Sequence, residues 1–265
     1  MDLNYFFTYE TELPAGSGYA LFSSTHLGIM LSALFVLIIF GVIYKNIVCI
    51  KNVSVCGASE NHEITSRVRK VTSVSVLFLM LIRIIYLFAT GHMSVYELPL
   101  HFCSVMGFLC YVNYISTGRF HALTSQVLYS LGLPAVLCAF IFPNGNMYPA
   151  LSFISLQSYI FHLMVLLYIE EGLIDGSIHP EAKKAYMVPL FLLITVPIIY
   201  LINHIFNSNY FFINTPSKGS PLEGILLVFG SGLYLLGLGL LVLLVMGLMY
   251  LFSFLMSVLL LKISV

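Results

Sequence analysis

The sequence predicts an all-α protein, a polytopic bundle of seven transmembrane helices. Hydrophobic residues make up 60% of the 265-residue chain and charged residues only 8%, whereas about 25% of the residues of a soluble domain are charged. The apolar residues gather in stretches of about 20, the length of helix that crosses a bilayer. Lys and Arg are concentrated in alternate loops between these stretches. We therefore expect one transmembrane domain, residues 1–265, in the cell membrane.

The predicted helices follow the apolar stretches in order along the chain: residues 20–44, 71–90, 98–116, 122–142, 151–169, 185–206 and 231–261. The third begins with Pro99, which suits the first turn of a helix because the missing N–H has no partner there. Pro143 and Pro149 bracket the turn between the fourth and fifth stretches. The last stretch is so long that one span and two spans both fit it, and its start, GILLVFGSGLY, is expected at the membrane interface.

The distribution of basic residues predicts the orientation of the bundle. One side of the membrane receives nine Lys and Arg residues and the other receives only Lys218, with Arg83 inside a helix. Cytoplasmic loops are enriched in Lys and Arg, so we expect the N-terminus outside and the C-terminus inside. The N-terminal segment has no positively charged start, unlike a secretory signal, and we expect the first helix to be retained. The net charge is zero and no basic tail is present, so nothing indicates a nucleic-acid partner.

Polar residues inside the predicted helices are concentrated in the outer half of the membrane. A helix rises about 1.5 Å per residue. This rise puts His101 roughly 5 Å and Arg83 about 10 Å below the outer surface, with His162 near the bilayer centre. The inner half has only Asn113 and Gln126. We therefore predict a polar pocket that opens outward between the first, second, third, fifth and sixth helices, because ionisable residues inside a membrane are functional by default. These helices contribute His26, Arg83, His101, Gln157, His162 and His204.

Several motifs resemble, in order along the chain, those of the YwaF-type family of bacterial integral membrane proteins. They are FSSTHLGI, ELPLHFCS, the proline after the fourth helix, SLQSYIFHLMVLL and NSNYFFINTPSKGSPLE. This family is related to eukaryotic transmembrane protein 164, which acts as a phospholipid acyltransferase. The resemblance covers nearly the whole chain. It implies a helical membrane fold and cysteine-dependent acyl transfer between lipids.

The resemblance carries over to single residues. His101 and His162 match the histidines of the family motifs. In the eukaryotic branch the cysteine directly precedes the helix-three histidine, whereas here Leu100 has that place and Cys103 comes two residues after the histidine. Two positions are about 200° apart on a helix, so we expect Cys103 and His101 on nearly opposite faces.

A lipid-modifying enzyme is the first of three functions that fit these residues. A thiol in lipid becomes a nucleophile only beside a base or a positive charge. His162 and His101 are the candidate catalytic partners of Cys103, and Arg83 is suited to hold a phosphate or an oxyanion. The predicted substrate-binding residues are Arg83, His26, Gln157 and His204. Because the pocket opens outward, a phospholipid is the natural acyl donor, and membrane lipids are the expected partners.

Two other functions use the same residues. A transporter or receptor would bind a small anion, or relay protons, through the histidines and the arginine. The absence of acidic residues inside the predicted helices argues against a cation pump. A zinc site made by histidines of four helices is the third function, but no H-x-x-x-H pair supports it. We expect no cofactor and no bound metal.

Overall fold

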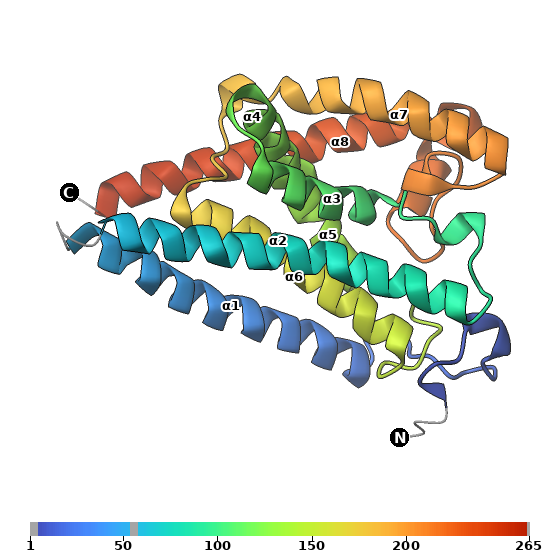
Figure 1. Cartoon of the computed structure of the whole chain (residues 1–265). Helices are drawn as coiled ribbons and strands as arrows, with labels where there is room; N and C mark the ends of the chain where they lie inside the picture. Colours follow the sequence, from blue (N-terminus) through green and yellow to red (C-terminus); the bar gives the residue numbers. More distant parts are fainter. Residues whose placement is uncertain (1–4, 54–57, 264–265) are drawn as a thin grey trace.

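The computed structural model describes residues 5–53 and 58–263, and this part of the chain contains helices and no strand, which confirms the predicted fold class. The helices in chain order are α1 (Ser24–Val53), α2 (Ala58–Ala89), α3 (Phe102–Ile115), α4 (Gly118–Val127), α5 (Leu133–Ile141), α6 (Phe153–Asp175), α7 (Met187–Phe206) and α8 (Leu222–Ile263) (Figure 1). A short 3₁₀ turn at Glu10–Glu12 precedes α1, and others lie between the helices at Val95–Glu97, Ala182–Lys184 and Tyr210–Phe212.

Helices α4 and α5 form one rod, joined by a turn of π-helix at Leu128–Gly132. The described helices therefore make seven rods, as the sequence predicts. A proline inside a helix has no N–H to donate and its ring clashes with the carbonyl four residues earlier. Pro134 follows the π turn at the second position of α5, so the wider turn accommodates the proline without breaking the rod.

Six of the described rods are long and apolar enough to cross a membrane, and α3 is shorter. Its 14 residues rise about 21 Å, less than the roughly 30 Å of a hydrocarbon core. The prediction that this helix begins at residue 98 is wrong, because it begins at Phe102. A proline keeps the preceding residue out of the helical region. Pro99 acts in this way on Leu98, which is extended with φ −60° and ψ 146°.

The long last stretch, α8, consists of two helical segments that meet at a kink. Its single non-helical residue is Gly230, with φ 66° and ψ 173°, a conformation open to glycine because it has no Cβ. The chain bends there, which separates a short leading segment from the long remainder of α8. Leu227 and Val228 in the leading segment are 85% and 78% exposed.

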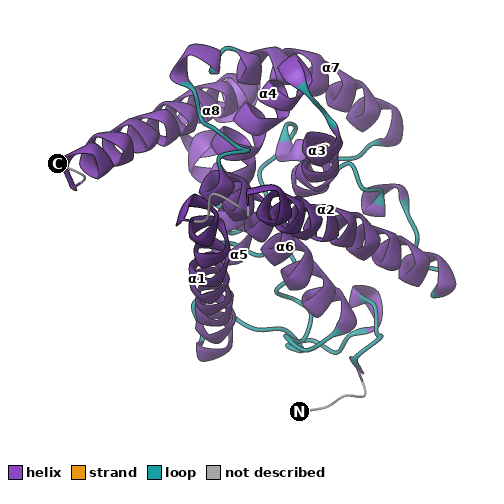
Figure 2. Ribbon diagram, turned by 60° about the vertical axis from the view of Figure 1, so that its left-hand side comes forward, coloured by secondary structure: helices purple, strands orange, loops and turns teal. Residues whose placement is uncertain are grey.

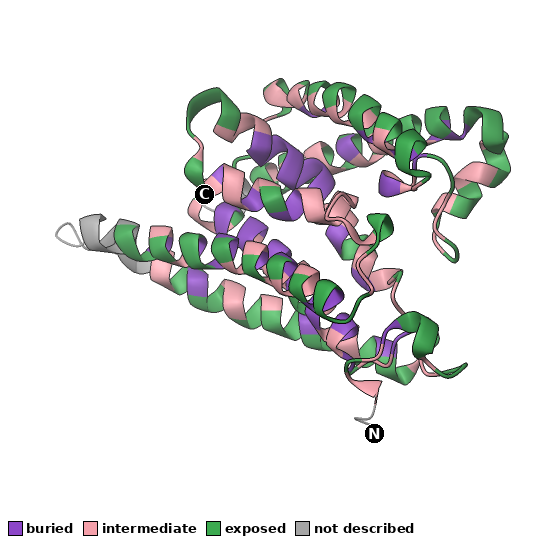
Figure 3. Cartoon of the chain, turned by 45° about the vertical axis from the view of Figure 1, so that its right-hand side comes forward, coloured by how far each residue is buried: buried purple, intermediate pink, exposed green. Residues whose placement is uncertain are grey.

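The rods pack in two groups on either side of α3 and α5. Helix α6 packs against α1 and α2, while α7 packs on α4 and α8 on the π turn (Figures 1 and 2). Figure 3 shows the buried residues gathered between the helices and the exposed ones on the outward faces. Many of the exposed side chains are large and apolar, as at Leu31 and Leu193. An apolar exterior of this extent suits contact with lipid.

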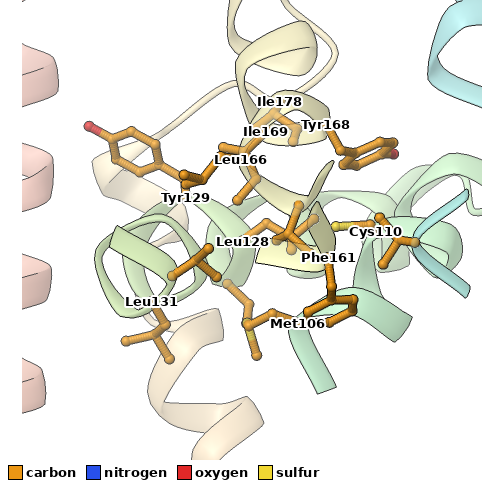
Figure 4. Packing of buried hydrophobic residues seen from close by; sticks show 14 of the residues in the cluster. Met106, Cys110, Leu128, Tyr129, Leu131, Phe161, Leu166, Tyr168, Ile169 and Ile178 are labelled. Atoms are coloured by element: carbon orange, nitrogen blue, oxygen red, sulfur yellow. The ribbon is translucent and has the colours of Figure 1, made fainter. Parts of the chain in front are cut away.

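The main hydrophobic core lies where α3, the π turn and α6 meet (Figure 4). Met106, Cys110 and Leu128 are fully buried there. Gly107 permits the close approach of these helices, since a Cβ at this position would lie 2.9 Å from Phe161 Cε2.

The first and last described segments lie at opposite ends of the bundle (Figure 1), as an odd number of crossings requires. Which of these ends faces outward stays a prediction.

Candidate functional site

Arg83 points into the bundle toward Gln157, as predicted. Its Nη1 lies 3.5 Å from Gln157 Oε1, and Gln157 Nε2 donates to the Leu79 carbonyl at 3.0 Å. Arg83 Nη2 donates to Glu97 Oε2 at 2.7 Å, and Glu97 Oε1 accepts from the Tyr9 hydroxyl at 2.8 Å. Burial and the Glu97 carboxylate raise the pKa of Tyr9, so the phenol remains the donor. Arg83 is thus already paired with a carboxylate, which competes with any phosphate or oxyanion for its donors.

His26 is fully buried at the start of α1. The Phe22 N–H donates to its Nδ1 at 2.8 Å, so the ring proton is on Nε2, which donates to the Phe140 carbonyl at 2.8 Å. Both nitrogens are therefore used to hold the beginning of α1 against the end of α5. A substrate that bound His26 would have to break one of these hydrogen bonds.

His101 is the residue directly before α3 and has extended backbone, with φ −63° and ψ 151°. The expectation that His101 and Cys103 lie on opposite faces of one helix is therefore wrong, because only Cys103 is on the helix. His101 Nε2 donates to the Tyr96 carbonyl at 2.9 Å. The rings of Tyr96 and Tyr210 meet the imidazole edge-on, each with a centroid distance of 5.1 Å.

His204 lies on an exposed position of α7, and its side chain makes no hydrogen bond within the described residues. The neighbouring Asn203 makes the contacts at this end of α7. Its Oδ1 accepts from the Tyr210 N–H at 2.8 Å and its Nδ2 donates to the Tyr210 carbonyl at 3.0 Å. Asn203 and Tyr210 are not among the predicted site residues. Tyr210 lies in the motif NSNYFF, which contributed to the family resemblance, so this motif was a signal that could have pointed to the loop.

The loop of residues 207–215 is strained. Asn207, Phe211 and Phe212 have φ values of 50°, 60° and 52°, a region that non-glycine residues occupy only when their surroundings hold them there. Asn209 supplies part of that support, because its Nδ2 donates to the Thr215 carbonyl at 2.9 Å and to Thr215 Oγ1 at 2.8 Å. The loop presents Tyr210 to His101, which fixes the residue before α3.

His162 lies on α6 and is half-buried. Its Nδ1 is 2.7 Å from the Ser158 carbonyl oxygen, and because a carbonyl can only accept, Nδ1 carries the ring proton. In the neutral ring the lone pair is then on Nε2, and this nitrogen has no hydrogen-bond partner in the part of the chain that the structure describes. The rings of Phe161 and Phe140 meet the imidazole edge-on at 5.2 and 6.2 Å. This histidine is oriented by the Ser158 carbonyl and open on its other nitrogen.

Cys103 is a free, half-buried cysteine in the first turn of α3. It packs against the core formed by α3, the π turn and α6. No hydrogen bond joins its thiol to His162 among the described residues. Catalytic hydrogen bonds are often made only when substrate is bound, so Cys103 as a nucleophile stays a prediction.

Comparison with known proteins identifies the chain. A family model described as the TMEM164 family matches residues 21–250. The chain belongs to the TMEM164 family. The match runs from just before α1 to near the end of α8 and so includes every predicted site residue. The searches of curated proteins and of solved structures found no match. Together with its long apolar helices, this membership makes the chain a multi-pass integral membrane protein.

This TMEM164-family chain also has a buried polar cluster at the opposite end of the bundle, which the sequence did not predict. Asn113 Oδ1 accepts from Arg69 Nη2 at 3.0 Å and from the Tyr168 hydroxyl at 2.9 Å. Thr72 Oγ1 donates to Glu171 Oε1 at 2.6 Å. The expectation that Asn113 and Gln126 are the polar residues of the inner half of the membrane is therefore wrong.

Acidic residues do lie inside a helix, contrary to the expectation from the sequence. Helix α6 extends to Asp175 and includes Glu170 and Glu171, six residues beyond the predicted end of this span at 169. Helix α2 likewise includes Arg69, which was assigned to a loop. Charged residues at helix ends interrupt the apolar pattern while the helix continues, so the apolar pattern alone underestimates helix length.

Proposed function

We propose that this TMEM164-family protein transfers or hydrolyses an acyl chain of a membrane phospholipid, with His162 as the general base. The observation that carries the proposal is the open Nε2 of His162, whose tautomer is set by the hydrogen bond from Nδ1 to the Ser158 carbonyl. A base oriented in this way resembles the histidine of a hydrolase triad, in which the far nitrogen takes the proton of the nucleophile.

Cys103 is the proposed nucleophile, in line with the cysteine-dependent chemistry that the family resemblance implies. His162 Nε2 removes the thiol proton, and the thiolate attacks the ester carbonyl of the lipid. The ester C–O bond breaks, an acyl thioester forms, and the proton on Nε2 passes to the departing alkoxide. A second hydroxyl, from water or from another lipid, then gives its proton to Nε2 while its oxygen attacks the thioester carbonyl. The C–S bond breaks, the acyl group leaves on the new oxygen, and the proton on Nε2 returns to the thiolate.

The surroundings of His162 favour a lipid as the substrate. Phe140 and Phe161 flank the imidazole, and the residue lies in the middle of an apolar helix, nine residues after its start at Phe153. A lipid ester reaches this depth from within the bilayer, whereas a soluble thioester in the cytoplasm does not. We propose further that the protein is located in the cell membrane and that it resembles the YwaF-type bacterial proteins within this family.

The alternative function, a transporter or receptor built on the same residues, has less support. Arg83 is paired with Glu97, and His26 uses both ring nitrogens on backbone atoms. His204 is exposed on α7. These residues bind separate partners and do not converge on one ligand.

The test is an acyl-release assay with the full chain in liposomes that contain a phospholipid with a labelled acyl chain. We expect His162→Ala to lower the rate by about 10²–10⁴-fold, the usual contribution of a general base. Cys103→Ser is expected to cause a similar loss. The double variant is expected to lose little more, because members of one catalytic unit are not additive.

The matched controls are His179→Ala and Cys138→Ser, which change exposed residues of the same types. Both are expected to keep the parent rate. Full activity of folded His162→Ala would contradict the proposal. Loss in His162→Ala with full activity in Cys103→Ser would keep the base and reject the thiol.

A further inference from the structure

A polar cavity of about 330 Å³ opens at the end of the bundle where α2 begins and α6 ends. Its walls come from α2, α3, α4 and the segment after α6. The residues used below are Ser66, Arg69, Asn113, His121, Asp175 and Ser177. None of them belongs to the predicted site, and none takes part in the proposed acyl chemistry.

Arg69 is buried and its charge is incompletely paired. Its Nη2 donates to Asn113 Oδ1 at 3.0 Å and to the Tyr168 hydroxyl at 2.6 Å, and both acceptors are neutral. Among the described residues the carboxylate in contact is that of Asp175, whose Oδ1 is 3.4 Å from Nη1. A guanidinium has five N–H donors, so donors remain for a ligand in the cavity that Arg69 lines.

Asp175 is largely satisfied by other donors. Its Oδ2 accepts from the Tyr44 hydroxyl at 2.9 Å, and its Oδ1 accepts from the Ser177 N–H at 2.8 Å and from the Ser177 hydroxyl. These hydrogen bonds share the negative charge of Asp175, and its contact with Arg69 is longer than each of them. The other nearby acid, Glu171, is turned toward Thr72 and does not line the cavity.

His121 also lines the cavity wall. Its Nδ1 is 2.9 Å from the Asn113 carbonyl oxygen and its Nε2 is 2.8 Å from the Ser177 carbonyl oxygen. Carbonyl oxygens only accept, so both contacts are hydrogen bonds only when the ring is an imidazolium with two N–H donors. The cavity is therefore lined by a guanidinium, by the Asp175 carboxylate and by an imidazole whose two ring nitrogens both face carbonyl oxygens.

We propose that this cavity binds a phosphate-bearing anion. Arginine is the side chain best matched to phosphate oxygens, because its donors form a planar fork. The anion would complete the pairing of the buried Arg69 charge. The hydroxyl of Ser66, which has no hydrogen-bond partner in the described part of the chain, would be a further donor. Two sources share this chemistry, the headgroup of an anionic phospholipid and free phosphate. The site is separate from His162 and does not depend on the proposed acyl transfer.

The experiment measures binding of two probes to the full chain in a neutral detergent by isothermal titration calorimetry. The probes are inorganic phosphate and dioctanoyl phosphatidic acid, with dioctanoyl glycerol as the phosphate-free comparison. Arg69→Gln is expected to weaken binding about tenfold or more, the effect of one hydrogen bond to a charged group. Because Arg69 is buried, this variant risks misfolding, and Ser66→Asp provides the second test.

Ser66 makes no hydrogen bond among the described residues and is half-buried, so Ser66→Asp removes no contact and adds a negative charge beside Arg69. It is expected to weaken binding at least about tenfold by like-charge repulsion. Arg67→Gln is the matched control, because Arg67 is on the same helix turn and its side chain is 74% exposed.

The outcomes distinguish a lipid headgroup from free phosphate, and they also test whether the cavity binds phosphate at all. Binding of both probes supports a general phosphate site, and binding of phosphatidic acid alone supports a lipid headgroup. Binding of dioctanoyl glycerol with equal affinity would overturn the proposal. So would the absence of binding by both phosphate probes, or equal affinities in the Ser66→Asp and Arg67→Gln variants.

Discussion

Gly107 offers the sharpest test of how α3 and α6 position the candidate site. A Cβ at Gly107 would lie 2.9 Å from Phe161 Cε2 and Cζ and 3.0 Å from Val76 Cγ1, closer than carbon atoms pack. An added methyl group in a packed core costs about 1–3 kcal/mol. Replacing glycine by alanine inside a helix stabilises the helix by about 1 kcal/mol. We therefore expect Gly107→Ala to lower the free energy of unfolding by up to about 2 kcal/mol.

The comparison with Gly28→Ala isolates the packing cost. Gly28 is also inside a helix, and a Cβ there would meet nothing within 4 Å. This variant therefore gains the higher helix propensity of alanine without a packing cost. The difference in the free energy of unfolding between the two variants is expected to be about 1–3 kcal/mol. The assay is unfolding by sodium dodecyl sulfate in mixed micelles, followed by far-ultraviolet circular dichroism.

The same change tests the proposed function. Phe161 precedes His162, so pushing its ring away from α3 moves the proposed base relative to Cys103. A displacement of about 1 Å at a reacting pair costs on the order of 10²-fold in rate. Equal stability of Gly107→Ala and Gly28→Ala would show that α3 and α6 do not pack as closely as described. A large loss of stability with unchanged acyl release would instead separate the packing from the chemistry.

Three further predictions follow from the ends of the bundle. Arg83→Leu leaves Glu97, whose side chain is only 8% exposed, as an unpaired buried charge. We therefore expect the free energy of unfolding to fall by about 3–5 kcal/mol. Much of this loss is expected to be restored in the double variant Arg83→Leu/Glu97→Gln. The hydrogen bond from Lys184 lowers the pKa of Glu181. This contact therefore stabilises the fold above the ordinary carboxyl pKa of 4.5, and the stabilisation is lost as the pH falls further. Carboxyl NMR titration of the parent and of Lys184→Gln measures the change in the pKa of Glu181. Tags at the two termini are expected to be accessible from opposite sides of the membrane, the N-terminal tag from outside, and protease protection in sealed vesicles tests this.

The fold could be predicted from the sequence because it follows from local composition. Apolar stretches long enough to cross a bilayer identify the helices without any knowledge of their partners. The errors occurred where the end of a helix depends on something other than apolarity. Pro99 delays the start of α3, and charged residues near Arg69 and Asp175 lie in helical turns beyond the apolar stretches.

The pairing of polar side chains could be predicted less well. Arg83 and Gln157 were assigned to one predicted pocket, and their side chains do meet. The partner that neutralises Arg83 was missed because Glu97 lies in a turn whose path the apolar pattern does not describe. Similarly, nothing in the motif around His26 indicates that backbone atoms occupy both of its nitrogens. These contacts depend on the tertiary packing of separate segments.

The short length of α3 has a consequence for the surrounding bilayer. Phe108 and Ile115 on α3 are exposed, so lipid tails are expected to touch a helix about 9 Å shorter than the hydrocarbon core. Hydrophobic mismatch of this kind is relieved by local thinning of the bilayer. A thinned patch would bring headgroups and water toward Cys103 at the start of α3. The rate of a reaction at this helix is then expected to change with the acyl-chain length of the host lipid, even when the substrate is kept the same.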